Sequence, residues 1–255
     1  MTEAPTSFEE LWSTTPTWTD EELKEAVTQS PLSFPLPEPD EKTQAAMRKV
    51  WRRHTLDRYV QRWDDAYVPD VPEELWSFDW RACDVGCGFG LFAFRESGRH
   101  PERAYLGIDK GTRRGSKLLQ RIEVLQRPNL FGMHGNAIPI LARMPAESFD
   151  LLTLYYPNPW WPTKHRKKRW SYHPIVPRLI ELLKPNGELL LCSNEGFYLS
   201  EWLFTMQNHP AAEGTIEEVY VGPVTVDLPE SRSHFESKFL QAGLPCGEIR
   251  FRKLG

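Results

Sequence analysis

Residues 82–94, ACDVGCGFGLFAF, decide the fold of this chain. The first five residues form a short apolar strand pattern that includes Asp84, and a helix pattern follows from Gly90. Glycines at such a turn let the backbone bend sharply and let a ligand come close to the main chain. The stretch therefore predicts a strand, a glycine loop and a helix, which form the first unit of a nucleoside-binding α/β domain.

Alternating strand and helix patterns continue from this unit to the C-terminus. Further strand patterns lie at residues 104–109, 130–135, 149–156 and 188–194, and two late ones at 217–223 and 246–253. Helix patterns lie at residues 90–100, 112–126, 138–144, 172–187 and 195–209. The crossovers are long enough for parallel pairing, so we predict an α/β protein with a doubly wound, mostly parallel sheet.

The N-terminal part has a different composition. Residues 1–45 are acidic and rich in proline, and we predict an arm there, followed by the α/β domain over residues 46–255. Thr19–Glu22 has the T-x-x-E pattern of a capping box, which predicts a short helix over residues 20–29. Residues 30–41 hold too much proline for regular structure, and residues 42–66 show a helix pattern with one basic side.

The bulk composition is that of a globular protein. Hydrophobic residues make up 40% and charged residues 26% of 255, and the sequence has neither a membrane-spanning apolar run nor a signal-peptide pattern. The four cysteines lack metal-ligand spacing, so we expect buried thiols, no metal site and a reducing cytoplasm. A net charge of −4 argues against indiscriminate nucleic-acid binding but leaves room for a local basic face.

Side chains at the next strand ends complete a candidate cofactor site. Asp109 ends the second strand, where a carboxylate can bind the two hydroxyls of a ribose. Asn136 and Ala137 follow the third strand, where an adenine would lie. Strand, glycine loop, helix, strand and acid together form the layout of a nucleoside-cofactor site.

The fourth strand runs into residues 155–169, YYPNPWWPTKHRKKR. Proline on both sides of Asn158 fixes the turn, and two tryptophans and a basic run follow. Ligands on such sheets bind beyond the strand ends, so we expect this loop to lie beside the cofactor. The tryptophans could stack a splayed base and the basic run could contact RNA phosphates; a solvated charged face and core tryptophans are the alternatives.

Three motifs resemble those of known methyltransferases. The G-x-G-x-G loop, with an acid two residues before it, resembles the class I S-adenosylmethionine-dependent methyltransferases. Residues 156–169 resemble F-P-D-P-W-x-K-x-R-H-x-K-R-R of the tRNA (guanine-N7) methyltransferase family, and Ser233–Glu236 resembles its T-K-F-E motif. The resemblance covers residues 80–252. It implies a Rossmann-like class I fold with an N-terminal extension, S-adenosyl-L-methionine as cofactor, tRNA as partner and N7-methylguanosine as product.

The resemblance also implies roles for particular residues. The cofactor would be bound by Asp84, Gly86, Gly88, Gly90, Asp109, Asn136 and Ala137. The substrate would be bound by Tyr156, Trp160, Trp161, Lys164, His165, Lys167, Lys168, Arg169 and Ser233. The catalytic candidates at the reacting centre are Asn158, Asn194 and Glu236.

The chain departs from the family's motifs at the substrate side. Asn158 and Asn194 stand where the family has aspartates, Pro162 and Lys164 replace a lysine and an arginine, and Ser233 replaces a threonine. A guanine N7 carries an in-plane lone pair and needs no deprotonation, so two amides should alter recognition more than methyl transfer.

The target base therefore stays open at this point, with Glu195 and Glu236 as the remaining acids. A small heterocyclic metabolite is an alternative substrate, and a non-catalytic RNA-binding relative is the alternative from another class. Binding of S-adenosylmethionine, and salt-dependent binding of tRNA, would separate the three. The sequence predicts no particular oligomeric state.

Overall fold

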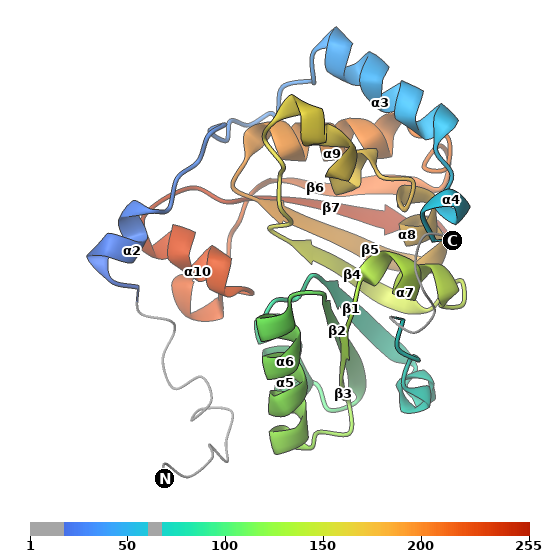
Figure 1. Cartoon of the computed structure of the whole chain (residues 1–255), viewed down its shortest axis with the longest axis vertical. Coiled ribbons are helices and arrows are strands. Elements are labelled where there is room, and N and C mark those ends of the chain that lie inside the picture. The colour runs from blue at the N-terminus through green and yellow to red at the C-terminus, as the bar shows by residue number, and fades with distance from the viewer. Residues whose placement is uncertain (1–17, 61–67) are drawn as a thin grey trace.

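A computed structural model describes residues 18–60 and 68–255 of the chain. Seven strands form one sheet in the order β3-β2-β1-β4-β5-β7-β6 (Figure 1). β7 runs antiparallel to both of its neighbours, and the other pairs are parallel. The strands are β1 (Trp80–Val85), β2 (Arg103–Asp109), β3 (Leu130–His134), β4 (Phe149–Tyr155), β5 (Leu183–Ser193), β6 (Ile216–Pro223) and β7 (Gly247–Lys253). The predicted doubly wound, mostly parallel sheet is confirmed.

Helices cover both faces of the sheet because successive strand residues point to opposite sides. Ala82 of β1 belongs to a cluster with α5 (Leu91–Arg99) and α6 (Thr112–Leu125), whereas the next residue, Cys83, belongs to a cluster with α7 (Ala137–Arg143), α8 (Val176–Leu182) and α9 (Gly196–Asn208). Strands buried on both faces read as continuous apolar runs, which explains the strand patterns of the sequence.

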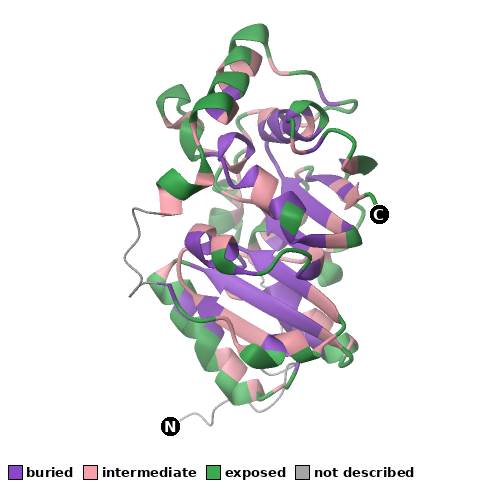
Figure 2. Cartoon of the chain, turned by 90° about the vertical axis from the view of Figure 1, so that its right-hand side faces the viewer, coloured by how far each residue is buried: buried purple, intermediate pink, exposed green. Residues whose placement is uncertain are grey.

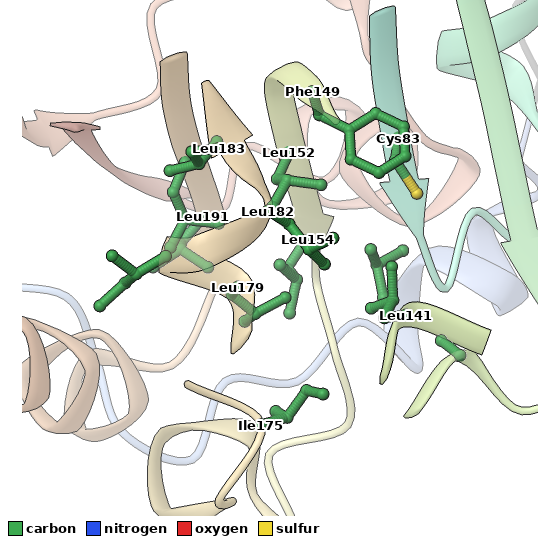
Figure 3. Packing of buried hydrophobic residues seen from close by; sticks show 14 of the residues in the cluster. Cys83, Leu141, Phe149, Leu152, Leu154, Ile175, Leu179, Leu182, Leu183 and Leu191 are labelled. Carbon is green, nitrogen blue, oxygen red and sulfur yellow. The ribbon is translucent and has the colours of Figure 1, made fainter. Parts of the chain in front are cut away.

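The larger cluster lies between the central strands and α7 and α8. Figure 3 shows Cys83, Leu152, Leu154 and Leu191 from β1, β4 and β5 among the side chains of this cluster. Leu141 of α7 and Leu179 of α8 also belong to it, and all six residues are buried. Removal of this apolar surface from water is the main term that holds the sheet and helices together.

Two predicted helices differ from those of the structure. The helix expected over residues 172–187 is limited to α8, and residues 183–187 join β5. Leu183 pairs with Phe149 of β4, and Asn186 has a left-handed φ of +64°, which ends any helix there. The helix expected over residues 20–29 is α2 (Asp20–Lys24), with the predicted Thr19 capping box.

The basic helix pattern of residues 42–66 is divided in the structure. It forms α3 (Glu41–Arg53) and α4 (Leu56–Val60), and residues 61–66 lie outside the described part. Met47 and Val50 of α3 pack on Tyr172 and on Phe204 of α9, so α3 covers the outer side of α9. Figure 2 shows the buried strands at the centre and a largely exposed outer surface on α3.

The arm itself contacts the domain. α2 lies beside α10 (His234–Gln241) in Figure 1, and Lys238 Nζ of α10 sits 5.3 Å from the Trp18 ring centre. The boundary predicted at residue 45 falls inside α3, and as a domain boundary it stays a prediction. Among the described helices, none combines the length and the apolar character needed to cross a bilayer.

Candidate active site

The candidate site is built where the parallel strands end. Register places Asp84 of β1 opposite Thr153 of β4, and Asp109 at the end of β2 opposite His134 of β3. The strand order reverses between β1 and β4, so the helices that follow these two strands, α5 and α8, pack on opposite faces of the sheet. Ligands of doubly wound sheets bind at such a switch point, so the predicted residues are brought to the expected edge.

Asp84 is a buried carboxyl at the switch point. It is 3% exposed, and the Thr153 hydroxyl donates to its Oδ1 at 2.9 Å. Burial raises the pKa of Asp84 to about 7, the Thr153 hydrogen bond acts in the opposite direction, and the charge of Asp109 adds to the rise. A carboxyl of this kind gains much by meeting a cationic group, because the cation compensates for the lost hydration.

Asp109 ties the glycine loop to the second strand. Its Oδ2 accepts the Gly88 N–H at 3.0 Å, and its Oδ1 accepts the Gly111 N–H at 2.7 Å. The carboxylate therefore fixes the loop on one side and the start of α6 on the other. Its two oxygens, placed beside the glycine loop, are the arrangement expected for a ribose-binding acid.

The three loop glycines have different roles. All have positive φ, which only glycine adopts freely. A Cβ on Gly86 would meet no atom within 4 Å, so the backbone there borders open space. A Cβ on Gly90 would lie 2.6 Å from Leu118 and 2.8 Å from Phe94, so Gly90 permits close packing of α5 on α6. Gly86 fits a ligand contact, and Gly90 acts in the structure as a packing residue.

Arg114 is a site residue that the sequence did not single out. Its Nε lies 3.2 Å and 3.3 Å from the two Asp109 oxygens, and its side chain is about half exposed. It follows the Gly111 turn at the start of α6, and this proximity to Asp109 is the only sequence signal for it. Asp109 itself is only 4% exposed, so a ribose bound to Asp109 would take the place of Arg114 as partner of this buried carboxylate.

Asn136 and Ala137 follow β3, as predicted, and the structure places them at the start of α7. Asn136 is the N-cap, and its Oδ1 accepts the Ile138 N–H at 3.1 Å. The Gly135 N–H donates to the Asp109 carbonyl at 3.1 Å, which links this turn to the end of β2. The two positions predicted for ribose and adenine are therefore neighbours.

These residues fit S-adenosyl-L-methionine. The open side of Gly86 leaves space along the loop, Asp84 matches a cationic amino group, and Asp109 matches the ribose hydroxyls. No cluster of three His, Cys, Asp or Glu side chains suited to a metal occurs in the described part of the chain. The site is thus assembled from a glycine loop and acids.

The loop of residues 156–169, the predicted acceptor loop, follows β4 and contains two strained residues. Tyr156 and Trp160 have φ values of +52° and +46°, in the left-handed region that costs an L-residue about 1–2 kcal/mol. The Tyr156 N–H donates to the Cys192 carbonyl at 2.9 Å, and the Trp160 N–H donates to Asn158 Oδ1 at 2.9 Å. Asn158 is exposed, and its own loop occupies its oxygen.

Arg169 corrects the prediction of a phosphate contact. It is 6% exposed, and its guanidinium donates to Glu201 and to the carbonyls of Trp160 and Trp161. A buried arginine with these partners is not available to an RNA backbone. It belongs to the scaffold of the loop.

The other basic residues of the run remain at the surface. Lys164, Lys167 and Lys168 are exposed, and His165 is partly exposed. Lys168 Nζ lies 4.4 Å from the Trp160 ring centre, so the lysine covers one face of that ring. Trp161 is 40% exposed. Trp161 is therefore the tryptophan with more open surface.

The S-H-F-E segment forms the start of α10 and holds Tyr156. Ser233 caps the helix by accepting the Glu236 N–H at 3.0 Å, and Glu236 is fully buried. Glu236 accepts from the Tyr156 hydroxyl at 2.7 Å and from Arg232 Nη2 at 2.7 Å. The structure thus brings Tyr156, Ser233 and Glu236 together, but its own partners occupy the Glu236 carboxylate.

Asn194 and Glu195 contact the N-terminal arm. Asn194 Nδ2 donates to Glu195 Oε1 at 2.9 Å and to Thr28 Oγ1 at 3.3 Å. The buried Glu195 accepts the backbone N–H groups of Gln29 at 3.1 Å and Ser30 at 2.8 Å. Two side chains expected at the substrate are therefore committed to residues 28–30 in this structure.

Two further residues of the site were missed by the sequence analysis. Arg232 bridges Glu236 and Glu248, and its spacing of four residues from Glu236 was an available signal. Glu201 is the one acid within the apolar run of α9, and an acid in such a run has to be paired when it is buried.

Comparison with known proteins agrees with this geometry. Residues 80–248 match the Methyltransf_4 family model, which is described as "Putative methyltransferase". The chain belongs to this family. It is an S-adenosyl-L-methionine-dependent methyltransferase, as its cofactor motifs predict.

Individual relatives are more distant. A tRNA (guanine-N(7)-)-methyltransferase of Rhodopirellula baltica is 26% identical over 82% of this chain and 79% of its own length. One of Lactiplantibacillus plantarum is 28% identical over 71% of this chain and 81% of its own length. The resemblance predicted from the motifs is confirmed. The fold is shared with the crystal structure of the 16S rRNA methyltransferase KamB, at a TM-score of 0.51. The two sequences are 17% identical, and the match covers 72% of this chain and 92% of that one.

Proposed function

We propose that this methyltransferase acts on tRNA and methylates N7 of a guanine in the cytoplasm. The observation that carries the proposal is the loop of residues 156–169, which leaves β4 at the switch point beside the cofactor loop and presents both an exposed tryptophan and exposed lysines. Curated relatives that span most of the chain are named for this reaction, which supports the same substrate class.

The reaction asks for positioning more than for acid–base chemistry. S-adenosyl-L-methionine, when bound, supplies an electrophilic methyl group on a sulfonium. Guanine N7 forms the new bond with its in-plane lone pair while the carbon–sulfur bond breaks, so no proton has to leave the base. The chain's task is to hold the base in line and to exclude water, which suits a rigid loop.

Asn158 lacks the second oxygen and the negative charge that an aspartate would place beside the base. Its Oδ1 accepts the Trp160 N–H, so the group left for a base is the Nδ2 amide NH2, which is a donor. An aspartate would keep a second oxygen and a negative charge near the cationic product. We therefore expect Asn158 to make transfer slower than an aspartate would.

The RNA backbone would be held by the exposed lysines. Lys164, Lys167 and Lys168 project from the segment that follows the tryptophans, where they could neutralise phosphates next to the target base. Trp161 has the exposed ring surface needed to stack a splayed base. Phosphate contacts and stacking would then act on adjacent parts of the nucleotide.

The test offers the purified chain a labelled methyl donor with total tRNA and, in parallel, with an extract of small metabolites. The proposal predicts label in the tRNA fraction. The label should be lost when Gly86 is replaced by Trp, which strains the backbone at its φ of +76° and fills the open side of the loop, in a protein whose melting transition shows that it is folded. Label only in a small product would overturn the proposal in favour of a heterocyclic metabolite. The absence of any label despite cofactor binding would also refute it.

A further inference from the structure

A buried carboxylate lies behind the acceptor loop. Glu201 of α9 is 3% exposed and accepts hydrogen bonds from Arg169, from Ser171 Oγ at 3.1 Å and from Tyr172 Oη at 3.4 Å. All three donors come from residues 169–172, which begin with the last residue of the basic run. Burial of a carboxylate is unfavourable unless such donors surround it, so this segment and α9 are held as one unit.

Arg169 connects that carboxylate to the loop. One nitrogen donates to Glu201, while Nη2 donates to the carbonyls of Trp160 and Trp161, each at 3.1 Å. Its Nε adds a third contact to the Trp160 carbonyl at 3.3 Å. The guanidinium is planar and rigid, so fixing one edge on Glu201 fixes the direction of the other edge. The Arg169 Cζ lies 4.6 Å from the Phe197 ring centre, and this contact limits movement of the guanidinium.

The backbone conformation of Trp160, whose carbonyl is bonded to Arg169, is unfavourable for an L-residue. Trp160 has a φ of +46°, and a bulky L-residue stays there only when its surroundings hold it. Its N–H is bonded to Asn158 Oδ1, and its carbonyl is bonded to Arg169. Both sides of the Trp160 residue are thus fastened, the carbonyl side through Glu201.

We propose that Glu201 is a positioning residue, which acts through Arg169 to hold Trp160 and Trp161 in the conformation that receives the methyl acceptor. Its effect on transfer rests on the proposed function, whereas its effect on the loop does not. Glu201 touches neither cofactor nor acceptor in this arrangement; it determines where the tryptophans are.

The test compares Glu201→Gln with Arg169→Lys and the double variant. Ser171 donates to Glu201 Oε2, whereas Arg169 and Tyr172 donate to Oε1, so glutamine with its single oxygen keeps an acceptor on only one side and removes the charge that orients Arg169. Lysine keeps the charge of residue 169 but cannot reach both carbonyls. The Trp160 amide is followed by hydrogen exchange in protein labelled with ¹⁵N-tryptophan, and its resonance is assigned with Trp160→Phe. This readout needs no substrate. Affinity for S-adenosyl-L-methionine and the rate of tRNA methylation are measured on the same samples.

Each single variant should accelerate hydrogen exchange at the Trp160 amide. Each should also lower kcat for tRNA by about tenfold, because the loss of one hydrogen bond to a charged group has about that effect. Cofactor affinity should stay within about twofold in both variants, because neither Glu201 nor Arg169 contacts the glycine loop, Asp84 or Asp109. The double variant should be no worse than the poorer single one, because both residues act through one connection.

Asp150→Asn is the matched control. Asp150 pairs with Lys184 at 2.7 Å and accepts the Arg81 backbone N–H at 2.8 Å, near the start of β4 and β1, at the end of the strands opposite the candidate site. It should lower the melting temperature without accelerating exchange at Trp160. Unchanged exchange in Glu201→Gln, or equal acceleration in Asp150→Asn, overturns the positioning role. Accelerated exchange in a protein that methylates no tRNA leaves the positioning role standing and refutes the proposed function.

Discussion

Replacement of Asp109 by asparagine tests the cofactor site at its most connected residue. The carboxylate accepts the Gly88 N–H on one oxygen and the Gly111 N–H on the other, at 3.0 Å and 2.7 Å. Asparagine has the same shape but only one oxygen, so its amide NH2 group must face one of these N–H donors. The variant therefore loses a backbone hydrogen bond, and the glycine loop or the start of α6 moves away.

The expected loss follows from the lost hydrogen bond. A hydrogen bond to a charged group contributes about 1.5–3 kcal/mol, which corresponds to a loss of cofactor affinity of about 10- to 150-fold. Isothermal titration calorimetry with S-adenosyl-L-methionine measures it directly. Arg114→Gln is the control, because it removes the half-exposed ion pair of Asp109 and leaves both backbone hydrogen bonds. It should bind the cofactor at least as tightly as the wild type.

Two results would refute this reasoning. An Asp109→Asn protein that binds the cofactor within about twofold of the wild type would show that the carboxylate does not hold the ribose or the loop. An equal loss in Arg114→Gln would show that the ion pair, rather than the two backbone contacts, organises the site. A folded Asp109→Asn protein, checked by its melting transition, is needed for either comparison.

Three further predictions concern the two sides of the site. Burial raises the pKa of Asp84 to about 7, so cofactor affinity should rise with pH up to about 7 as the carboxyl ionises. Folding stability should fall over the same range, because the carboxyl of the unfolded chain already ionises near pH 4. Asp84→Asn should abolish both trends, measured by calorimetry and thermal melts. Lys167→Ala with Lys168→Ala should reduce the salt dependence of tRNA binding by about one unit of slope per lost phosphate contact, measured by filter binding, and an unchanged slope would place the RNA elsewhere. Asn158→Asp should accelerate guanine methylation by about fivefold, since a carboxylate near the cationic product contributes about 1 kcal/mol; a slower variant in single-turnover assays would contradict that account.

The alternation of strands and helices along the chain and the position of the cofactor site could be predicted from the sequence because both depend on local patterns. The apolar run around Cys83 and the glycines after it specify a strand and its turn without reference to distant residues. Asp109 was found because the end of β2 is fixed by the same alternation. Parallel pairing then aligns these strand ends at one edge.

The acceptor side could not be predicted in the same way because its residues are placed by tertiary contacts. Arg169 belongs to a basic run that reads as surface, yet Glu201, distant in sequence, draws it into the interior. Asn194 follows a strand end as expected, but contacts with Thr28 depend on how the arm folds back. The end of α8 differed for a similar reason, because pairing of Leu183 with Phe149 outweighs helix propensity.

The position of the transferred methyl group is the most direct test of the central claim. Borohydride reduction followed by aniline cleaves RNA chains at N7-methylguanosine, so an unmodified tRNA transcript treated with the enzyme and S-adenosyl-L-methionine reports the modified nucleotide as a cleavage site. The account predicts cleavage at a guanosine that depends on the methyl donor and that, at a subsaturating donor concentration, is reduced about 10- to 150-fold in Asp109→Asn. Methyl label in the tRNA without cleavage would place the methyl group on another atom and contradict the claim.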